Sequence, residues 1–263
     1  MLDVHPPHHA ATTWRDFFIH IATIVLGLLI AIGLEQSVEW FHHRHQLHQL
    51  EADLHSEGIR NLHIALDNIH SAELRRQSDA DQYVELLQAA RDHRAPAAYP
   101  PQFVMYTKPA YAVWTVAQQS GTLGLLPRED ALSYARLYGV VQYAVDQVKD
   151  INAALDKRSV AMLPATSDPP VLHTLLQAGK AAPASDLSLL NPEDLHGFRE
   201  AVGEDMATSR QSIKWNVYLY GIEWSILHGS RSDEENVRAF NDAMDAYQQG
   251  GTTALLAKYP LPE

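Results

Sequence analysis

The chain has 263 residues, of which 46% are hydrophobic and 20% are charged, as in an ordinary folded protein. Its formal net charge of −12 repels nucleic-acid phosphates, so the composition argues against a DNA- or RNA-binding protein. The absence of cysteine excludes disulfides, cysteine-ligated zinc, iron–sulfur clusters and thiol catalysis.

An apolar run without formal charge, Phe17–Leu34, lies near the start of the chain. A helix of this length measures about 27 Å, which is close to the roughly 30 Å hydrocarbon core of a bilayer. Trp14 precedes the run and Trp40 follows it. Aromatic side chains are enriched at these positions in transmembrane helices, because they lie at the two membrane–water interfaces. The sequence therefore predicts a single-pass transmembrane anchor over residues 14–41. A cleaved signal peptide and a buried core helix are the alternatives.

Residues 1–13 contain prolines and histidines without periodicity, and we expect them to form a mobile tail. The basic residues that flank the apolar run are nearly balanced, with Arg15 before it and Arg44 and Arg60 after it. A short tail before a first apolar segment is the usual form of a signal anchor. We therefore expect the tail on the inner side of the membrane and the remaining residues on the outer side.

From Trp14 to about His93 the chain contains no proline, and apolar residues recur at spacings of three and four. This pattern predicts one continuous helix that crosses the membrane and continues as a long amphipathic helix, with a bend near Gly58. The pattern passes through Glu35 and Glu39 without a helix breaker.

Helix-start and helix-stop signals divide the rest of the chain. They predict, in order, a short helix ending at Gly121, a helix from Pro127 to about Leu163, a short helix over Val171–Ala178, a helix from an Asn191 cap to near Gly229, and a last helix from Ser232 to about Gln249, ended by Gly250 and Gly251. Proline-containing loops are expected over 94–110 and 164–191. The predicted fold is all-α: one N-terminal transmembrane helix continues into a long amphipathic helix, packed with a helical bundle domain over residues 42–263.

Histidine is abundant, with 15 residues, and several lie just after the apolar run. His42, His45 and His48 have the three-residue spacing that can place two imidazoles on one metal ion, so they form a candidate metal site. The alternative is a polar collar of histidines at the lipid headgroups. His20 lies inside the apolar run, where an ionisable group suggests a pigment or haem ligand or a side chain that reaches the headgroups.

The residues expected to contact the membrane or a partner lie in and beside the apolar run. They are Trp14, Gly27, Ala31, Glu35, Glu39 and Trp40. Gly27 and Ala31 form a weak small-xxx-small pattern, which favours close helix contact, and a carboxylate at Glu35 needs a partner or water. No nucleophile-elbow, P-loop, H-E-x-x-H or dinucleotide-binding motif is present, so we expect neither an enzyme nor a bound cofactor.

The stretch DFFIHIATIVLGLLIAIGLEQSVEW, with the histidine-rich run behind it, resembles a group of uncharacterised bacterial membrane proteins with one N-terminal span and a helical domain. The segment AVWTVAQQSGTLGLLPREDALSYARLY is similar to their middle region. The resemblance implies a bacterial envelope protein and no activity. Combined with the orientation expected of a signal anchor, it leads us to expect a single-pass protein of the bacterial inner membrane with a periplasmic domain. The resulting hypothesis is a non-enzymatic accessory or scaffold subunit that binds the lipid bilayer and associates with other membrane proteins or with itself. The alternative is an envelope sensor that binds metal or a small ligand, or a subunit that binds pigment.

Overall fold

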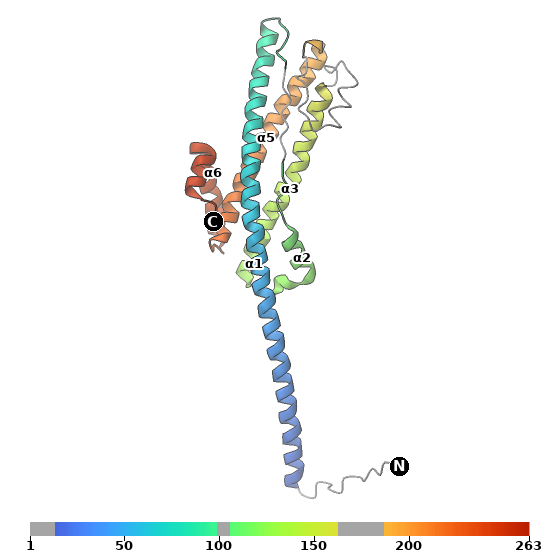
Figure 1. Cartoon of the computed structure of the whole chain (residues 1–263), viewed down its shortest axis with the longest axis vertical. Helices are drawn as coiled ribbons and strands as arrows, with labels where there is room; N and C mark the ends of the chain where they lie inside the picture. The colour runs from blue at the N-terminus through green and yellow to red at the C-terminus, as the bar shows by residue number, and fades with distance from the viewer. Residues whose placement is uncertain (1–13, 99–105, 163–186, 263) are drawn as a thin grey trace, which may run out of the picture. The chain divides into compact units, whose positions relative to one another are not determined.

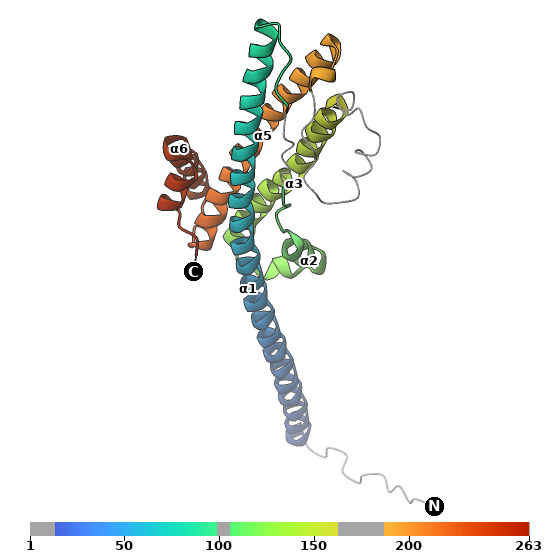
Figure 2. The same ribbon diagram turned by 45° about the horizontal axis from the view of Figure 1, so that its top comes forward.

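The computed structural model describes residues 14–98, 106–162 and 187–262, and all regular secondary structure in these ranges is helical (Figure 1, Figure 2). The α-helices are α1 (Trp14–Arg91), α2 (Ala112–Ser120), α3 (Arg128–Met162), α5 (Pro192–Leu227) and α6 (Asp233–Lys258), and the 3-10 segments are η1 (Thr122–Leu125) and η3 (Leu187–Leu189). The prediction of an all-α fold is confirmed. The predicted tail over 1–13 and the predicted helix over Val171–Ala178 lie outside the described residues.

The chain divides into two compact units, Met1–Glu51 and Ala52–Glu263. The described part of the first unit is the N-terminal portion of α1. The second unit contains the remainder of α1 and all the other helices. The boundary between anchor and domain that the sequence places at residues 41 and 42 stays a prediction, because it depends on the position of a membrane.

Local capping signals fix where the later helices begin and end. At the start of α5 the Asn191 side chain accepts a hydrogen bond from the backbone N–H of Asp194, at 2.9 Å, and Pro192 occupies the first turn. At the start of α6 the Ser232 hydroxyl accepts one from the N–H of Glu235, at 3.2 Å. Helix α2 ends at Gly121, whose φ of 76° lies in the left-handed region that favours glycine.

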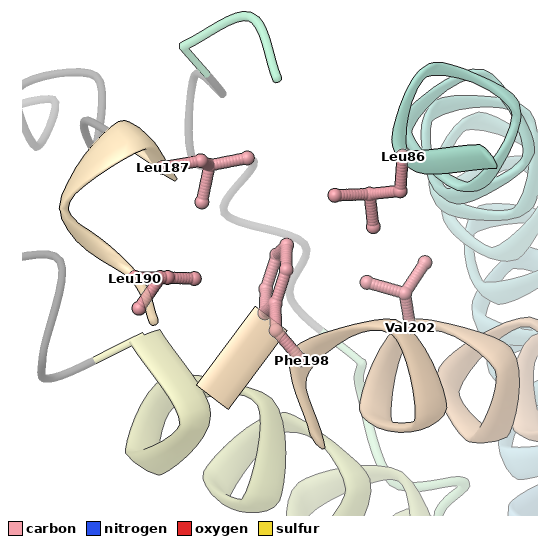
Figure 3. Close-up of a cluster of buried hydrophobic side chains, with 5 residues drawn as sticks. All are labelled: Leu86, Leu187, Leu190, Phe198 and Val202. Carbon is pink, nitrogen blue, oxygen red and sulfur yellow. The ribbon is translucent and has the colours of Figure 1, made fainter. Parts of the chain in front are cut away.

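Helix α5 is the centre of the second unit and contacts both α3 and α6. Its largest fully buried side chains include Phe198 and Tyr220. Figure 3 shows Phe198 and Val202 of α5 facing Leu86 of α1 and Leu187 of η3. Burial of these apolar side chains supplies the main driving force that holds the helices together.

The predicted break of the last helix at the glycine pair is confirmed, but the sequence did not predict the helical stretch that follows it. Gly250 and Gly251 have non-helical backbone angles, but helical structure resumes and α6 ends at Lys258. The carboxylate of Glu73 on α1 accepts hydrogen bonds from Tyr247 before the kink, at 2.7 Å, and from Thr252 after it, at 3.2 Å. This shared acceptor holds the two sides of the kink against α1, a contact that local sequence does not encode.

Candidate functional site

The N-terminal portion of α1 contains an exposed apolar stretch. An 18-residue window of α1 reaches a mean hydropathy of 2.6, and none of that window is buried. Its hydroxyl groups bond to the helix backbone: Thr23 donates to the carbonyl of Ile19 at 2.8 Å, and Ser37 donates to that of Gly33 at 2.6 Å. An apolar surface with internally satisfied polar groups is what a hydrocarbon environment requires, so this segment is a candidate membrane span.

The interface residues predicted from sequence all lie on this part of α1 and are all exposed. Trp14 is 77% exposed and Trp40 is 54% exposed, and the guanidinium of Arg44 lies 5.3 Å from the centre of the Trp40 ring. A Cβ added at Gly27 would meet no atom within 4 Å. The described residues therefore leave this surface uncovered.

The candidate metal ligands His42, His45 and His48 are exposed on α1. Among the described residues no group of three or more His, Asp or Glu side chains is placed to hold a metal ion. His48 instead lies 3.5 Å from a carboxylate oxygen of Glu51. His20 is also exposed within the apolar segment. The metal and pigment hypotheses thus gain no geometric support within the described chain.

A line of buried polar side chains between α1 and α5, which we call the polar seam, is the feature that sequence reasoning missed. Its members are Glu57, Asn61, Asn68, Arg75 and Asp79 on α1 and Asp205, Asn216 and Glu223 on α5. Asn68 donates to the side-chain oxygen of Asn216 at 3.2 Å. Further along, Arg75 forms an ion pair with Asp205. These pairs fix an antiparallel register between the two helices.

One end of the polar seam is a buried ion-pair network that also includes α3. Arg158 of α3 pairs with Asp79, and its Nη1 lies 2.9 Å from Oδ2 of Asp205. Burial lowers the pKa of the Arg75 guanidinium and raises the pKa of the Asp79 carboxyl, and the neighbouring opposite charges counteract both shifts. Two arginines and two aspartates balance in charge, so removing one member leaves an uncompensated charge in the core.

The other end of the polar seam holds two buried carboxyl groups. Glu57 accepts a hydrogen bond from the Tyr138 hydroxyl at 2.6 Å and another from the backbone N–H of Val113 at 3.0 Å. Glu223 is 1% exposed, and burial, reinforced by the charge of Glu57, raises the pKa of its carboxyl to about 8. A Cβ added at Gly58 would lie 2.5 Å from Oε1 of Glu223, so glycine permits this close approach of α5 to α1.

Two asparagines of the polar seam also hold the segment that leads into α2. The side chain of Asn61 donates to the Ala110 carbonyl at 3.0 Å and accepts from the Ala110 N–H at 2.7 Å. Asn68 makes the same pair of hydrogen bonds with Thr107, at 2.9 and 3.0 Å. Each amide therefore supplies hydrogen-bond partners to the backbone of a stretch that has no regular secondary structure.

A sequence signal for the polar seam was present. On an ideal helix the buried polar residues of α1 fall within an arc of about 60°. The exposed histidines His45, His48, His55, His63 and His70 lie on the opposite side of the same helix. A stripe of Glu, Asn, Arg and Asp along one helix face is normally solvent-exposed, so amphipathicity alone does not predict that this stripe is buried.

The polar seam is buried, and its hydrogen bonds and ion pairs join α1 to α3 and α5. Comparisons with known proteins add no further constraint: no protein-family model matches the chain, and the searches of curated proteins and of solved structures return no match. The resemblance to single-span bacterial membrane proteins therefore stays an expectation.

Proposed function

We propose that this protein is a single-span, non-enzymatic membrane subunit. The N-terminal part of α1 anchors it in a bacterial inner membrane, and the helical domain lies on the periplasmic side. The span binds lipid and packs against other membrane proteins or further copies of the chain. The observation that carries the proposal is the apolar window of α1, with mean hydropathy 2.6 and no buried residue.

Full exposure of the apolar window supports a membrane environment over a core environment. A core helix of a soluble protein buries its apolar surface, and the described residues bury none of this window. Exposing this apolar surface to water therefore costs about 25 cal/mol of free energy for each Å². A bilayer or a neighbouring transmembrane helix removes that cost.

The span also has features that favour helix association over a simple tether. Gly27 and Ala31 are small residues one turn apart, and the space at the Gly27 Cβ position is open. Glu35 follows the apolar run directly, and Glu39 lies 4.0 Å from the Nε2 atom of His43. A carboxylate at the edge of the hydrocarbon is stabilised by a partner, which supports docking onto a neighbouring chain.

Carbonate extraction and vesicle flotation of the full chain test the anchor. We expect the wild type to remain with the membrane fraction, because its apolar segment has no other place to bury. The variant Leu26→Arg/Ile30→Arg should move to the soluble fraction or fail to insert, since each central arginine costs roughly 2.5–3.5 kcal/mol. The control is Leu74→Arg/Val116→Arg, at exposed apolar positions of the second unit, which should still float. A wild-type chain that is released by carbonate would contradict the anchor.

Mild detergent extraction tests the subunit role separately. We expect an assembly well above the 29.4 kDa of one chain. A monodisperse monomer that floats with membranes but carries no other protein would contradict the subunit role and leave the anchor intact.

Labelling of a single introduced cysteine tests the orientation of the domain. Because the chain has no cysteine of its own, a cysteine at exposed Gln249 reports the side of the membrane through its reaction with an impermeant maleimide. Labelling from the cytoplasmic side alone would overturn the periplasmic assignment.

A further inference from the structure

A surface groove with a volume of about 580 Å³ lies between α1 and α5 in the second unit. Its lining residues are Arg76 of α1 and Gly203, Met206, Ala207 and Arg210 of α5. Both arginine side chains are exposed. The volume falls within the roughly 300–1,000 Å³ of small-molecule sites, and we call it the arginine groove.

Neither arginine of the groove forms a close ion pair with another described residue. Among the described residues, the ion pairs involve other arginines and neither Arg76 nor Arg210. The carboxylates of Asp79 and Asp205 pair with Arg158, and that of Glu204 pairs with Lys157. Glu73 accepts hydrogen bonds from Tyr247 and Thr252 and forms no close ion pair with either arginine of the groove. The groove therefore presents two exposed guanidinium groups whose N–H donors are open to an anion from solution.

We propose that the arginine groove binds a small molecule that carries a carboxylate or phosphate group. Guanidinium groups present planar pairs of N–H donors that match the two oxygens of such an anion. Met206 and Ala207 supply an apolar wall for a short non-polar portion of the ligand. The chain as a whole carries a net charge of −12 and repels anions, so a basic pair in one groove localises binding there.

Gly203 leaves space on the floor of the groove. A Cβ added at this position would meet only the Tyr83 ring, at 3.8 Å, which is ordinary van der Waals contact. Ala207 is exposed and also lines the groove. Gly203 therefore has room for a methyl group, and exposed Ala207 is the position at which a larger side chain can fill the groove while both arginines are kept.

Isothermal titration of the full chain in detergent micelles tests the site, with inorganic phosphate, pyrophosphate and succinate as probes and chloride as the ionic-strength control. We expect saturable binding of at least one oxyanion probe and none of chloride. Arg76→Gln and Arg210→Gln should each weaken binding by about tenfold or more, because each removes charge-assisted hydrogen bonds. Ala207→Leu should also weaken binding, by filling the groove. A preference for succinate or for the phosphates assigns the anionic group.

The matched control is Arg238→Gln, which removes an exposed arginine from α6 outside the groove and should leave binding unchanged. Circular dichroism of each variant checks that the helices are retained. Binding that survives the double variant Arg76→Gln/Arg210→Gln, or no saturable binding of any probe up to about 10 mM, overturns the proposal. Neither result bears on the membrane anchor, which the flotation experiment tests independently.

Discussion

Glu223 is almost completely buried, and this burial is the main reason that the pKa of its carboxyl group is raised to about 8. At neutral pH this side chain therefore holds a proton that an exposed glutamate would lose. Glu57, its acidic neighbour, satisfies both carboxylate oxygens with hydrogen bonds from Tyr138 and Val113. The two glutamates thus have different environments although they belong to the same polar seam.

The raised pKa of Glu223 predicts that folding stability falls as pH rises. The folded state binds this proton more tightly than the unfolded chain, whose carboxyl pKa is near 4.5. Its contribution is full below about pH 4.5 and is lost progressively as the pH approaches 8. Glu223→Gln, which mimics the protonated form, should flatten this dependence by an amount on the order of 3 kcal/mol.

Thermal unfolding of the full chain in detergent at pH 5 and pH 8.5 measures this effect. The difference in Tm between the two pH values should be smaller in Glu223→Gln than in the wild type. Some dependence should remain, because the pKa of Asp79 is also raised by burial. Glu234→Gln, at an exposed position of α6, is the control and should behave as the wild type. An unchanged pH dependence in Glu223→Gln would show that its carboxyl is ionised in the folded state.

At the scale of secondary-structure elements, α1 and α5 are joined by buried polar contacts where most helix pairs use apolar ones. Arg75 is 2% exposed and Asp205 is 0% exposed, and the two form an ion pair between the helices. Burial of charge is costly, so such pairs add little net stability over an apolar pair. Their larger effect is on register, because any sliding of α5 along α1 separates the charges.

Removal of one partner of this ion pair should be strongly destabilising. Asp205→Leu leaves the Arg75 charge in the core and should cost about 3–5 kcal/mol. The double variant Arg75→Met/Asp205→Leu removes both charges and should recover much of that loss. Chemical denaturation of the wild type, both single variants and the double variant forms the thermodynamic cycle. A double variant less stable than the sum of the single losses would contradict the account.

Packing of α5 against α6 depends on Gly221. A Cβ at this position would lie 2.8 Å from the Ala243 Cβ and 2.9 Å from the backbone carbonyl oxygen of Ala239. Backbone cannot move aside as a flexible side chain can, so Gly221→Ala should destabilise by about 1–3 kcal/mol. Gly139→Ala in α3 meets no atom within 4 Å and should instead stabilise by roughly 0.5–1 kcal/mol. Equal shifts in Tm for the two variants would be inconsistent with this packing.

At the scale of the whole molecule, the chain divides into the units Met1–Glu51 and Ala52–Glu263. The second unit contains the polar seam, the arginine groove and the apolar cluster around Phe198. A chain that begins at Ala52 should therefore remain helical and unfold cooperatively in solution without detergent. Circular dichroism and sedimentation velocity measure this. Loss of helical structure or aggregation of the truncated chain would show that the first unit contributes to folding.

The sequence predicted the helices well where local chemistry defines their ends. Asn191, Ser232 and Gly121 act through hydrogen bonds or backbone angles within a few residues, so their effects are readable from short stretches. It predicted the break at Gly250 and Gly251 but missed the helical stretch after it, where contacts of Glu73 with Tyr247 and Thr252 hold both sides of the kink. Those partners are more than 170 residues apart along the chain, and a local pattern does not include them.

The sequence by itself determined the all-α fold and the candidate membrane span, because helical periodicity and hydropathy are properties of neighbouring residues. Only the tertiary structure decided which polar stripe of α1 is buried. Asn68 and Arg75 lie in the core because α5 presents Asn216 and Asp205 opposite them, whereas the histidines on the other face meet no such partner among the described residues. The same packing of α1 against α5 creates the arginine groove. A buried polar residue is stable only when a distant residue completes its hydrogen bonds, and that complement exists only in the folded chain.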